Sequence, residues 1–577
     1  MSDPVLGRGM PLLWAALFVW SCSEEGRVGQ TGEPGPVAGA VNGGGGAQAA
    51  GTGGDGGSSA GTPPRGGDGG GGSASGGMAG IDGTAGAGGA AIEVPRSPPF
   101  DWVGVVGTGQ SLSIGATAGY LSAVQPYGNL TLLDSGPDPK YPLSDGQPDW
   151  SLVPLIEPVR AKVAGSGAGY SDGQYPNNVV GETPHSGMAN TLSWLWQERG
   201  DVGDYVTVHS VVGWSGHCLV DIDKTGGKRA YQGSLSEARA IAELATAQGK
   251  TFGYGAIIMT HGECDASTPD YGDGLHTLLT DYNADLKAIT GQSEDVVMLV
   301  SQQSTKATGS NGSAAQVFRA GNDHPGEIIC TGPKYQYQYA PDKLHLKAAG
   351  YRRLGEKYAE VFDLVVNRKA AWRPLGPTSA TREGDTVRVT FHVPEPPLVW
   401  SEEIAPPHQT AHVEWAQGRG FEVVTAAQES VTIGSATIDG DSVVLTLVDP
   451  PASGESLIVG YAMTQDGEGN QGGEVTGLRG LLRDSDAFVG ADTEEISVVL
   501  TQGSKVITSV EPGAFRRRTG FDIVTEGGEP TGLVVATRDT DDQLTLFEPW
   551  TGPSGTRSLS FHYDMYNYAV HFSLQVD

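Results

Sequence analysis

The chain has 577 residues, a formal net charge of -31 and a hydrophobic content of 38%. Its length allows about two to four domains. A surface this acidic repels the phosphate backbone of nucleic acids, which argues against DNA and RNA as partners. The 4 cysteines are too few for a fold that depends mainly on disulfides. These features leave an enzyme or a binding protein built on ordinary hydrophobic cores.

The N-terminal residues are typical of an exported protein. Residues 10–20 form an apolar run that is too short to span a bilayer and suits the core of a signal peptide. Cys22 follows this run, and the junction resembles a bacterial lipobox, in which the cysteine becomes the lipidated first residue. We therefore expect residues 1–22 to be a lipoprotein signal peptide, and Ser23 favours the outer membrane of a Gram-negative cell. The alternative is an ordinary secretory signal, which also exports the chain.

Residues 23–93 consist largely of Gly, Ala, Ser and Thr with scattered Asp. Such a segment buries too little apolar surface to offset the entropy lost on ordering it. We expect a disordered tether that holds the following domain away from a membrane surface.

Residues 94–374 show short apolar runs alternating with helical patterns. The apolar runs are 103–106, 205–212, 255–260 and 296–301, and the helical patterns are 188–198, 234–248 and 275–289. This alternation predicts an α/β domain, a flavodoxin-like three-layer sandwich with a parallel sheet between helices. Residues 121–180 are rich in Gly, Pro, Asp and Tyr, and we expect a long loop there that forms part of a substrate rim.

The first apolar run ends in a glycine-rich turn, residues 107–113, that contains Ser111. Open α/β sheets place their chemistry at the carboxyl ends of their strands, so Ser111 is a candidate nucleophile. The alternative is a Gly/Ser turn without chemistry. Ser215 lies in a similar Gly-Trp-Ser-Gly stretch, but it lacks the glycine two residues after the serine that a nucleophile elbow requires.

Asp342 and His345 lie just before a helical pattern that runs to about residue 366. A carboxylate and an imidazole at the head of one helix can act together as an orienting group and a general base. The alternative is that Asp342 caps the helix and His345 packs against it. Glycines also follow the second and third apolar runs, where they allow backbone N–H groups to face a ligand.

Four blocks occur in the order found in the SGNH (GDSL-like) hydrolase superfamily. They most closely resemble its Gly-Gln-Ser branch, which includes sialate O-acetylesterases and acetyl xylan esterases. The blocks are Gly109-Gln110-Ser111-Leu112, Gly216, Gly262-Glu263-Cys264-Asp265 and Asp342-Lys343-Leu344-His345.

The resemblance implies an exported serine esterase that hydrolyses O-acyl, above all O-acetyl, esters on carbohydrate. Ser111 would be the nucleophile, His345 the general base and Asp342 the residue that orients and stabilises the imidazolium. An acylated carbohydrate is then the expected partner, with membrane contact only through the lipid anchor. The chemistry needs no cofactor, and the sequence shows no closed metal-ligand spacing. The alternative function is a non-catalytic surface carbohydrate-binding protein on the same fold.

The same resemblance extends to the surroundings of the nucleophile. The oxyanion hole is expected to use the backbone N–H groups of Ser111, Gly216 and Cys264. Gln110 and Glu263 are expected to bind substrate. Many relatives outside this branch have an asparagine where this chain has Cys264.

Three cysteines remain after Cys22, and an exported protein is expected to oxidise one pair of them. Cys218 and Cys264 each lie just past a strand that we place next to the active site. We therefore expect a Cys218–Cys264 disulfide and a free Cys330.

The periodicity changes after residue 374. Apolar and polar residues alternate over runs such as 386–393 and 442–448, and clusters of Pro, Gly and Asp separate these runs. This pattern predicts a β-sandwich module over residues 375–485. Residues 486–577 are expected to be a second β module or an extension of the first. Both a spacer role and carbohydrate binding are open for these modules.

Overall fold

The computed structural model describes residues 95–577 except for sixteen short gaps. The gaps are residues 117, 120, 123–124, 135–149, 160–180, 228–229, 307–311, 403, 408–412, 466–470, 474–475, 487–494, 516–522, 527–528, 547 and 563–565. The chain divides into Met1–Glu93 and one compact unit, Val94–Asp577. The expected signal peptide, Cys22 and the expected tether lie outside the described residues. Over the described part of the chain, none of the helices combines the length and the apolar character needed to cross a bilayer.

The predicted α/β domain is present and has a seven-stranded sheet with the order β3-β2-β4-β1-β5-β6-β7. Neighbouring strands run parallel except for the antiparallel pair β2–β3. Strands β2 and β3 fall within the segment 121–180, for which we expected only a loop. The strands are β1 (Trp102–Gly109), β2 (Leu130–Asp134), β3 (Trp150–Pro154), β4 (Thr207–Val211), β5 (Phe252–Thr260), β6 (Val297–Gln302) and β7 (Ile328–Pro333).

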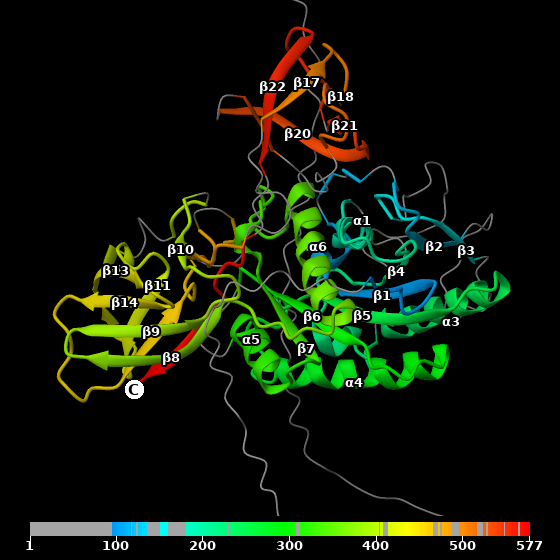
Figure 1. The fold of residues 1–577 in the computed structure, drawn as a ribbon. Coiled ribbons are helices and arrows are strands. Elements are labelled where there is room, and N and C mark those ends of the chain that lie inside the picture. Colours follow the sequence, from blue (N-terminus) through cyan, green and yellow to red (C-terminus); the bar gives the residue numbers. More distant parts are fainter. Residues whose placement is uncertain are drawn as a thin grey trace, which may run out of the picture. The chain divides into compact units, whose positions relative to one another are not determined.

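Helices cover both faces of this sheet, because successive side chains of a strand point to opposite sides. Val105 of β1 packs in a core cluster with helices α1 and α6, whereas Val106 packs in the cluster that contains α3 and α4. Figure 1 shows α1 and α6 as one layer and α3 and α4 as the other. The helices are α1 (Pro184–Glu198), α2 (Leu219–Ile222), α3 (Ala230–Ala247), α4 (Tyr271–Thr290), α5 (Ser313–Asp323) and α6 (Ala348–Phe362).

A β-sandwich follows the α/β domain. Its two sheets have the orders β13-β14-β9-β8 and β12-β11-β15-β23, and one hydrophobic core lies between them. Two further short strands, β10 and β16, pair with each other in a separate two-stranded antiparallel sheet. The strands are β8 (Gly376–Glu383), β9 (Thr386–His392), β10 (Val399–Trp400), β11 (Phe421–Thr425), β12 (Ser430–Val431), β13 (Ile433–Asp439), β14 (Ser442–Leu447), β15 (Leu457–Tyr461), β16 (Leu482–Arg483) and β23 (Phe572–Val576).

A closed barrel, β17-β18-β21-β20-β19-β22, is inserted into the sandwich between β16 and β23. Because β23 pairs with β15, the last strand of the segment 486–577 belongs to the sandwich and the barrel alone forms the second module. The barrel has its own core, in which Val498, Ile507 and Leu544 are fully buried. Its strands are β17 (Glu495–Leu500), β18 (Val506–Ser509), β19 (Ile523–Glu526), β20 (Glu529–Thr540), β21 (Gln543–Leu546) and β22 (Gly555–His562).

The sandwich and the α/β domain are joined by buried hydrogen bonds. The His571 N–H, just before β23, donates to Gln302 Oε1 at the end of β6 (2.9 Å), and Gln302 Nε2 donates to the His571 carbonyl (3.1 Å). The Tyr335 hydroxyl donates to the Ala569 carbonyl (2.6 Å), and Arg479 Nη2 donates to the Tyr335 carbonyl (2.8 Å). The sandwich is therefore structurally continuous with the α/β domain rather than a detachable spacer.

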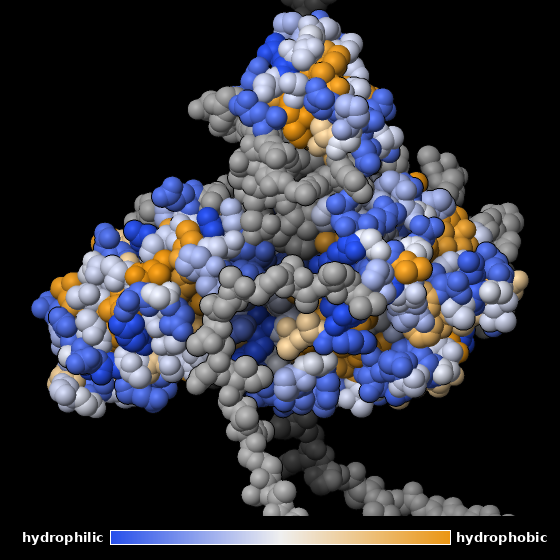
Figure 2. Space-filling view, in the orientation of Figure 1, coloured by the Kyte–Doolittle hydropathy of each residue, from blue (hydrophilic) through white to orange (hydrophobic). Residues whose placement is uncertain are grey.

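The visible surface is largely hydrophilic, with scattered apolar patches (Figure 2). Among the described residues, exposed large hydrophobic side chains include Val220 on α2 and Val413 in the sandwich segment, and Val499, Val506 and Val510 lie on or next to the adjacent barrel strands β17 and β18. Single exposed side chains of this kind are normal on a globular protein.

Glu422 on β11 makes the stability of the sandwich depend on pH. Its burial raises its pKa to about 7 and outweighs the hydrogen bonds from Thr464 and Met463, which lower it. The unfolded chain titrates this group near 4.5, so the folded state binds more protons between these values. The contribution of Glu422 to the free energy of unfolding is therefore fully present below about pH 4.5 and is lost as the pH rises through 7.

We expect Glu422→Gln to flatten this dependence, because the amide oxygen still accepts from the Met463 and Thr464 N–H groups and the side chain does not titrate. The thermal midpoint of the wild type should fall relative to that of the variant between pH 5 and pH 7.5, by the equivalent of up to about 3 kcal/mol. Parallel pH profiles of the two proteins would contradict the expectation.

Candidate active site

Ser111 lies where β1 leaves the sheet. Strand β1 ends at Gly109, and a 3-10 turn, Ser111–Ile114, begins two residues later. Gly109 has a φ of 136°, and a Cβ there would lie 2.2 Å from the Thr260 carbonyl oxygen of β5. Only glycine fits this position. The turn leaves Ser111 8% exposed at the carboxyl edge of the sheet.

Asp342 and His345 lie on a loop that leads into α6, as expected. The base of the loop is closed by two backbone hydrogen bonds, from the Ala340 N–H to the His345 carbonyl (2.7 Å) and from the Lys347 N–H to the Gln338 carbonyl (2.9 Å). Lys343 at its tip has a φ of 56°. A loop tied at its base in this way holds both side chains in one orientation.

The structure brings Ser111, His345 and Asp342 into one hydrogen-bonded chain. Ser111 Oγ lies 2.8 Å from His345 Nε2, and His345 Nδ1 lies 2.6 Å from Asp342 Oδ2. Because a carboxylate can only accept, Nδ1 carries the proton and Nε2 is free to accept from the serine hydroxyl. The other Asp342 oxygen accepts from the backbone N–H groups of His345 (3.0 Å) and Leu344 (3.1 Å).

These hydrogen bonds keep Asp342 ionised. Partial burial of the carboxylate acts to raise its pKa, but the bonds from the His345 side chain and from the two backbone N–H groups outweigh it and lower the pKa to about 2. An ionised carboxylate next to Nδ1 fixes the tautomer and stabilises a positive imidazolium. The arrangement can therefore remove a proton from Ser111 at neutral pH.

Behind the nucleophile, Gln110, Glu263 and Lys334 form a buried polar network. Gln110 Nε2 donates to Glu263 Oε2 (2.9 Å), and Lys334 Nζ donates to Glu263 Oε1 (2.8 Å). All three residues are at most 4% exposed. We expected Gln110 and Glu263 to bind substrate, but their polar atoms are engaged with each other and with Lys334. They position the turn that carries Ser111.

Two of the three residues expected to form the oxyanion hole, Cys264 and Gly216, have different surroundings from each other. The Cys264 N–H donates to Gln110 Oε1 (3.2 Å) and so takes part in the buried network. Gly216 is exposed in the loop after β4. Gly213 of the same loop packs on the nucleophile turn instead, since a Cβ there would lie 1.8 Å from Ser113 Oγ. The sequence pattern did not distinguish these two glycines, because both follow the same strand.

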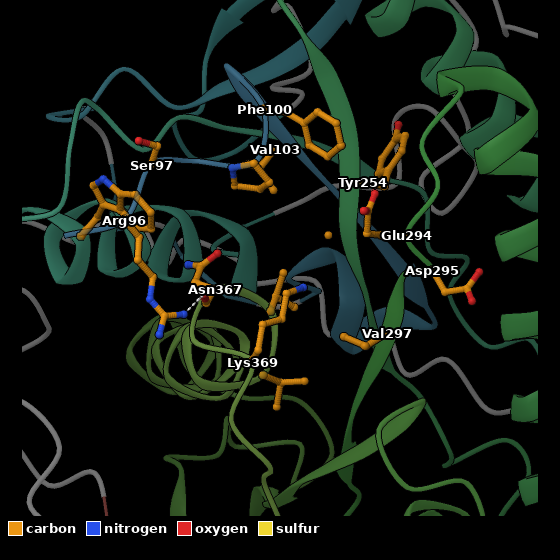
Figure 3. Close-up of a pocket in the computed structure, with 15 residues that line it drawn as sticks. Arg96, Ser97, Phe100, Val103, Tyr254, Glu294, Asp295, Val297, Asn367 and Lys369 are labelled. Atoms are coloured by element: carbon orange, nitrogen blue, oxygen red, sulfur yellow. Dashed lines mark hydrogen bonds between the residues drawn. The ribbon is translucent and has the colours of Figure 1, made fainter. Parts of the chain in front are cut away.

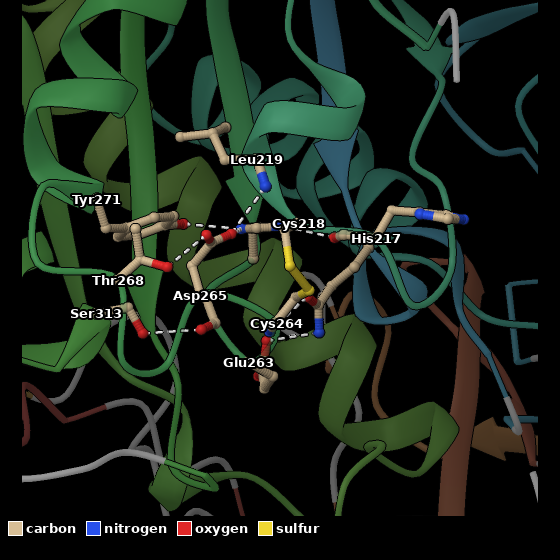
Figure 4. A network of polar contacts seen from close by, with 12 residues as sticks. His217, Cys218, Leu219, Glu263, Cys264, Asp265, Thr268, Tyr271 and Ser313 are labelled. Atoms are coloured by element: carbon tan, nitrogen blue, oxygen red, sulfur yellow. Dashed lines mark hydrogen bonds and ion pairs between the residues drawn. A yellow bond between two sulfur atoms is a disulfide. The ribbon is translucent and has the colours of Figure 1, made fainter. Parts of the chain in front are cut away.

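A disulfide joins Cys218 and Cys264, the pair that we expected, and so links the loop after β4 to the loop after β5. Figure 4 shows this bond among further contacts between the two loops. The Leu219 N–H donates to Asp265 Oδ2 (2.8 Å), and His261 Nε2 donates to the His217 carbonyl (3.0 Å). Cys330 is buried and free, and burial raises its pKa to about 12, so its thiol is unreactive.

A cavity of ≈ 250 Å³ lies at the amino ends of the parallel strands, the opposite end from Ser111. Its lining includes Val103, Tyr254 and Val297, which lie near the amino ends of β1, β5 and β6 (Figure 3). Arg96 at its rim donates to the Asn367 carbonyl (2.6 Å). Its position separates it from the Ser111 chemistry.

Comparison with known proteins gives distant likenesses only. No family model matches the chain, and no curated protein matches it. A carbohydrate acetylesterase from Xanthomonas citri is 14% identical with a TM-score of 0.38, over 67% of this chain and 81% of that one. A protein from Arabidopsis thaliana is 14% identical with a TM-score of 0.31, over 46% and 98%. The structure of NanS is 13% identical with a TM-score of 0.28, over 45% and 96%. At these values the assignment depends on the site geometry.

The Lys334–Glu263 pair provides a test of the buried network. We expect Lys334→Met to destabilise the protein by about 3–5 kcal/mol, because it leaves the Glu263 carboxylate buried without its cation. The double variant Lys334→Met/Glu263→Gln should recover much of this loss, since the amide still bonds to Gln110. Denaturant unfolding of both variants and the wild type measures the difference. Equal stability of the single and double variants would show that the two charges are not coupled.

Proposed function

We propose that the chain is a serine esterase that hydrolyses O-acyl, above all O-acetyl, esters on carbohydrate. The observation that carries the proposal is the unbroken chain from Ser111 Oγ through His345 to Asp342, with distances of 2.8 Å and 2.6 Å. The carbohydrate ester class rests on the resemblance of the four motif blocks to the Gly-Gln-Ser branch of SGNH hydrolases.

The fold supports the same class. The strand order β4-β1-β5-β6-β7 corresponds to the order of flavodoxin-like sheets, with β2 and β3 added at one edge. Ser111 follows β1, Glu263 follows β5, and the Asp342–His345 loop follows β7. All three groups therefore meet at the carboxyl edge of the sheet, where this class of fold places its site.

In the proposed mechanism, Ser111 Oγ attacks the ester carbonyl while its proton passes to His345 Nε2. Asp342 stabilises the imidazolium, and His345 then protonates the leaving sugar oxygen, which leaves an acyl group on Ser111. Water, deprotonated by His345, hydrolyses this acyl-enzyme. General-base assistance of this kind contributes roughly 10²–10⁴-fold. The Ser111 N–H is the first of its turn, where helical N–H groups lack intrahelical partners, and it would donate to the oxyanion.

Hydrolysis of p-nitrophenyl acetate by the full chain tests the chemistry. Ser111→Ala should reduce the rate to that of buffer, and Asp342→Asn should lower kcat by about 10⁴-fold, because the amide favours the wrong tautomer of His345. Ser215→Ala is the matched control and should retain the wild-type rate. Full activity in Ser111→Ala would end the assignment.

A fluorophosphonate probe separates the enzyme from the non-catalytic carbohydrate-binding alternative. The esterase should be labelled at Ser111, and the label should be absent from Ser111→Ala but present in Ser215→Ala. An unlabelled wild type that still binds acetylated polysaccharide would support the alternative. A panel of acetylated xylans and sialic acids then identifies the sugar.

The proposal includes export and lipid anchoring at Cys22. Its support is the apolar run at residues 10–20 and the small residue before the cysteine. In a Gram-negative host, the wild type should incorporate labelled palmitate and sediment with membranes, whereas Cys22→Ser should be unlabelled and soluble in the periplasm. The same distribution for both proteins would exclude the anchor.

A further inference from the structure

Two histidines and one glutamate come together on the far side of the α/β domain from Ser111. His276 lies on α4, His324 directly follows α5, and Glu327 directly precedes β7. One nitrogen or oxygen of each side chain lies within 4.8 Å of the others. The cluster is at the amino end of β7, whereas the Asp342–His345 loop follows its carboxyl end, so the cluster takes no part in the proposed esterase chemistry.

The backbone holds two of these residues in a tight turn. The His324 N–H donates to the Ala320 carbonyl (2.9 Å), and the N–H groups of Glu327 and Ile328 both donate to the His324 carbonyl (3.1 Å each). Gly326 within the turn has a φ of 84°. His276 is fixed on a helix of 20 residues. The three side chains are therefore presented from rigid elements rather than from a free loop.

The spacing of the side-chain atoms suits a small divalent cation. His276 Nε2 and Glu327 Oε2 are 3.2 Å apart. Ligands at about 2.0–2.2 Å from a tetrahedral zinc ion are roughly 3.4 Å apart, so these two atoms already have the separation of a ligand pair. The rings of His276 and His324 stack with centroids 3.7 Å apart and an angle of 10° between their planes. In this stacked arrangement the in-plane lone pairs of the two rings run parallel, so one ring must turn about its side-chain torsions before both nitrogens can face a single ion.

An ordinary ion pair explains only part of this arrangement. A surface pair between His276 and Glu327 contributes little free energy and requires no third residue. It does not account for the second imidazole, which brings a third potential ligand atom within 4.8 Å of the other two. Two imidazole nitrogens with one carboxylate oxygen are a ligand set of zinc and related first-row metals, whereas magnesium and calcium prefer all-oxygen sites.

We propose that His276, His324 and Glu327 bind one divalent first-row metal ion, of which Zn²⁺ is the representative, with water completing the coordination. The ion would join α4 to the turn between α5 and β7. Helix α5 also contacts the sandwich, since Phe318 packs against Gly376 of β8. The role is structural: the ion binds the folded state and stabilises this junction. The site was not apparent from the sequence because His276 lies 48 positions before His324 (324 − 276 = 48).

The full chain, freed of metal with EDTA, is titrated with ZnCl₂ by calorimetry, and bound zinc is counted after gel filtration. We expect one zinc per chain and a rise in the thermal midpoint of roughly 2–4 °C. His324→Ala and His276→Ala should each weaken binding at least tenfold, and both are expected to match the wild-type midpoint in EDTA. His392→Ala, on β9 of the sandwich, is the control and should bind as the wild type does.

Two outcomes would overturn the proposal. One is the absence of saturable binding by the wild type. The other is binding that persists unchanged in His324→Ala and His276→Ala, which would place the zinc elsewhere, for instance at His217 and Asp221. The hydrolysis of p-nitrophenyl acetate in EDTA is measured in parallel, so that a failure of the metal site and a failure of the esterase assignment are distinguished.

Discussion

The buried ion pair between Lys334 and Glu263 is the contact on which the candidate active site depends. Glu263 comes from the end of β5 and Lys334 from the end of β7, and neither charge reaches solvent. Because the loss of one partner leaves the other charge buried and uncompensated, both elements must be in place together. The same Glu263 binds Gln110, the residue that precedes the nucleophile, so the pair fixes the direction in which Ser111 leaves the sheet.

The pair also connects the site to the second half of the chain. Lys334 is followed directly by Tyr335, whose hydroxyl and carbonyl are held by Ala569 and Arg479 of the sandwich segment. A displacement of the sandwich would therefore move Tyr335 and, through the backbone, the adjacent Lys334. Cys264 contributes from the opposite side, since its sulfur joins two loops while its N–H holds Gln110. The cysteine thus combines two supporting functions, since it joins the two loops and holds the residue that precedes Ser111.

The parts of the fold that local pattern determines could be predicted. The apolar runs around β1, β4, β5 and β6 and the pairing of Asp342 with His345 depend on neighbouring residues, and periodicity and spacing reveal them. The contacts that could not be predicted join distant positions. Gln110 and Glu263 are 153 residues apart, and no local feature shows that their side chains face each other rather than substrate. Strands β2 and β3 were missed because Gly, Pro and Asp dominate the segment around them.

The insertion of the barrel imposes an order on the maturation of the protein. Strand β23 follows the barrel in the chain, so all residues of the barrel are synthesised before the sheet β12-β11-β15-β23 can acquire its last strand. His571, which binds Gln302 at the end of β6, is also made only then. At the carboxyl edge of the α/β sheet, Gln302 thus depends for this hydrogen bond on a residue that follows it by 269 positions (571 − 302 = 269). A chain that has emerged only as far as β16 lacks this support, so the site is complete only once the residues beyond the barrel are present.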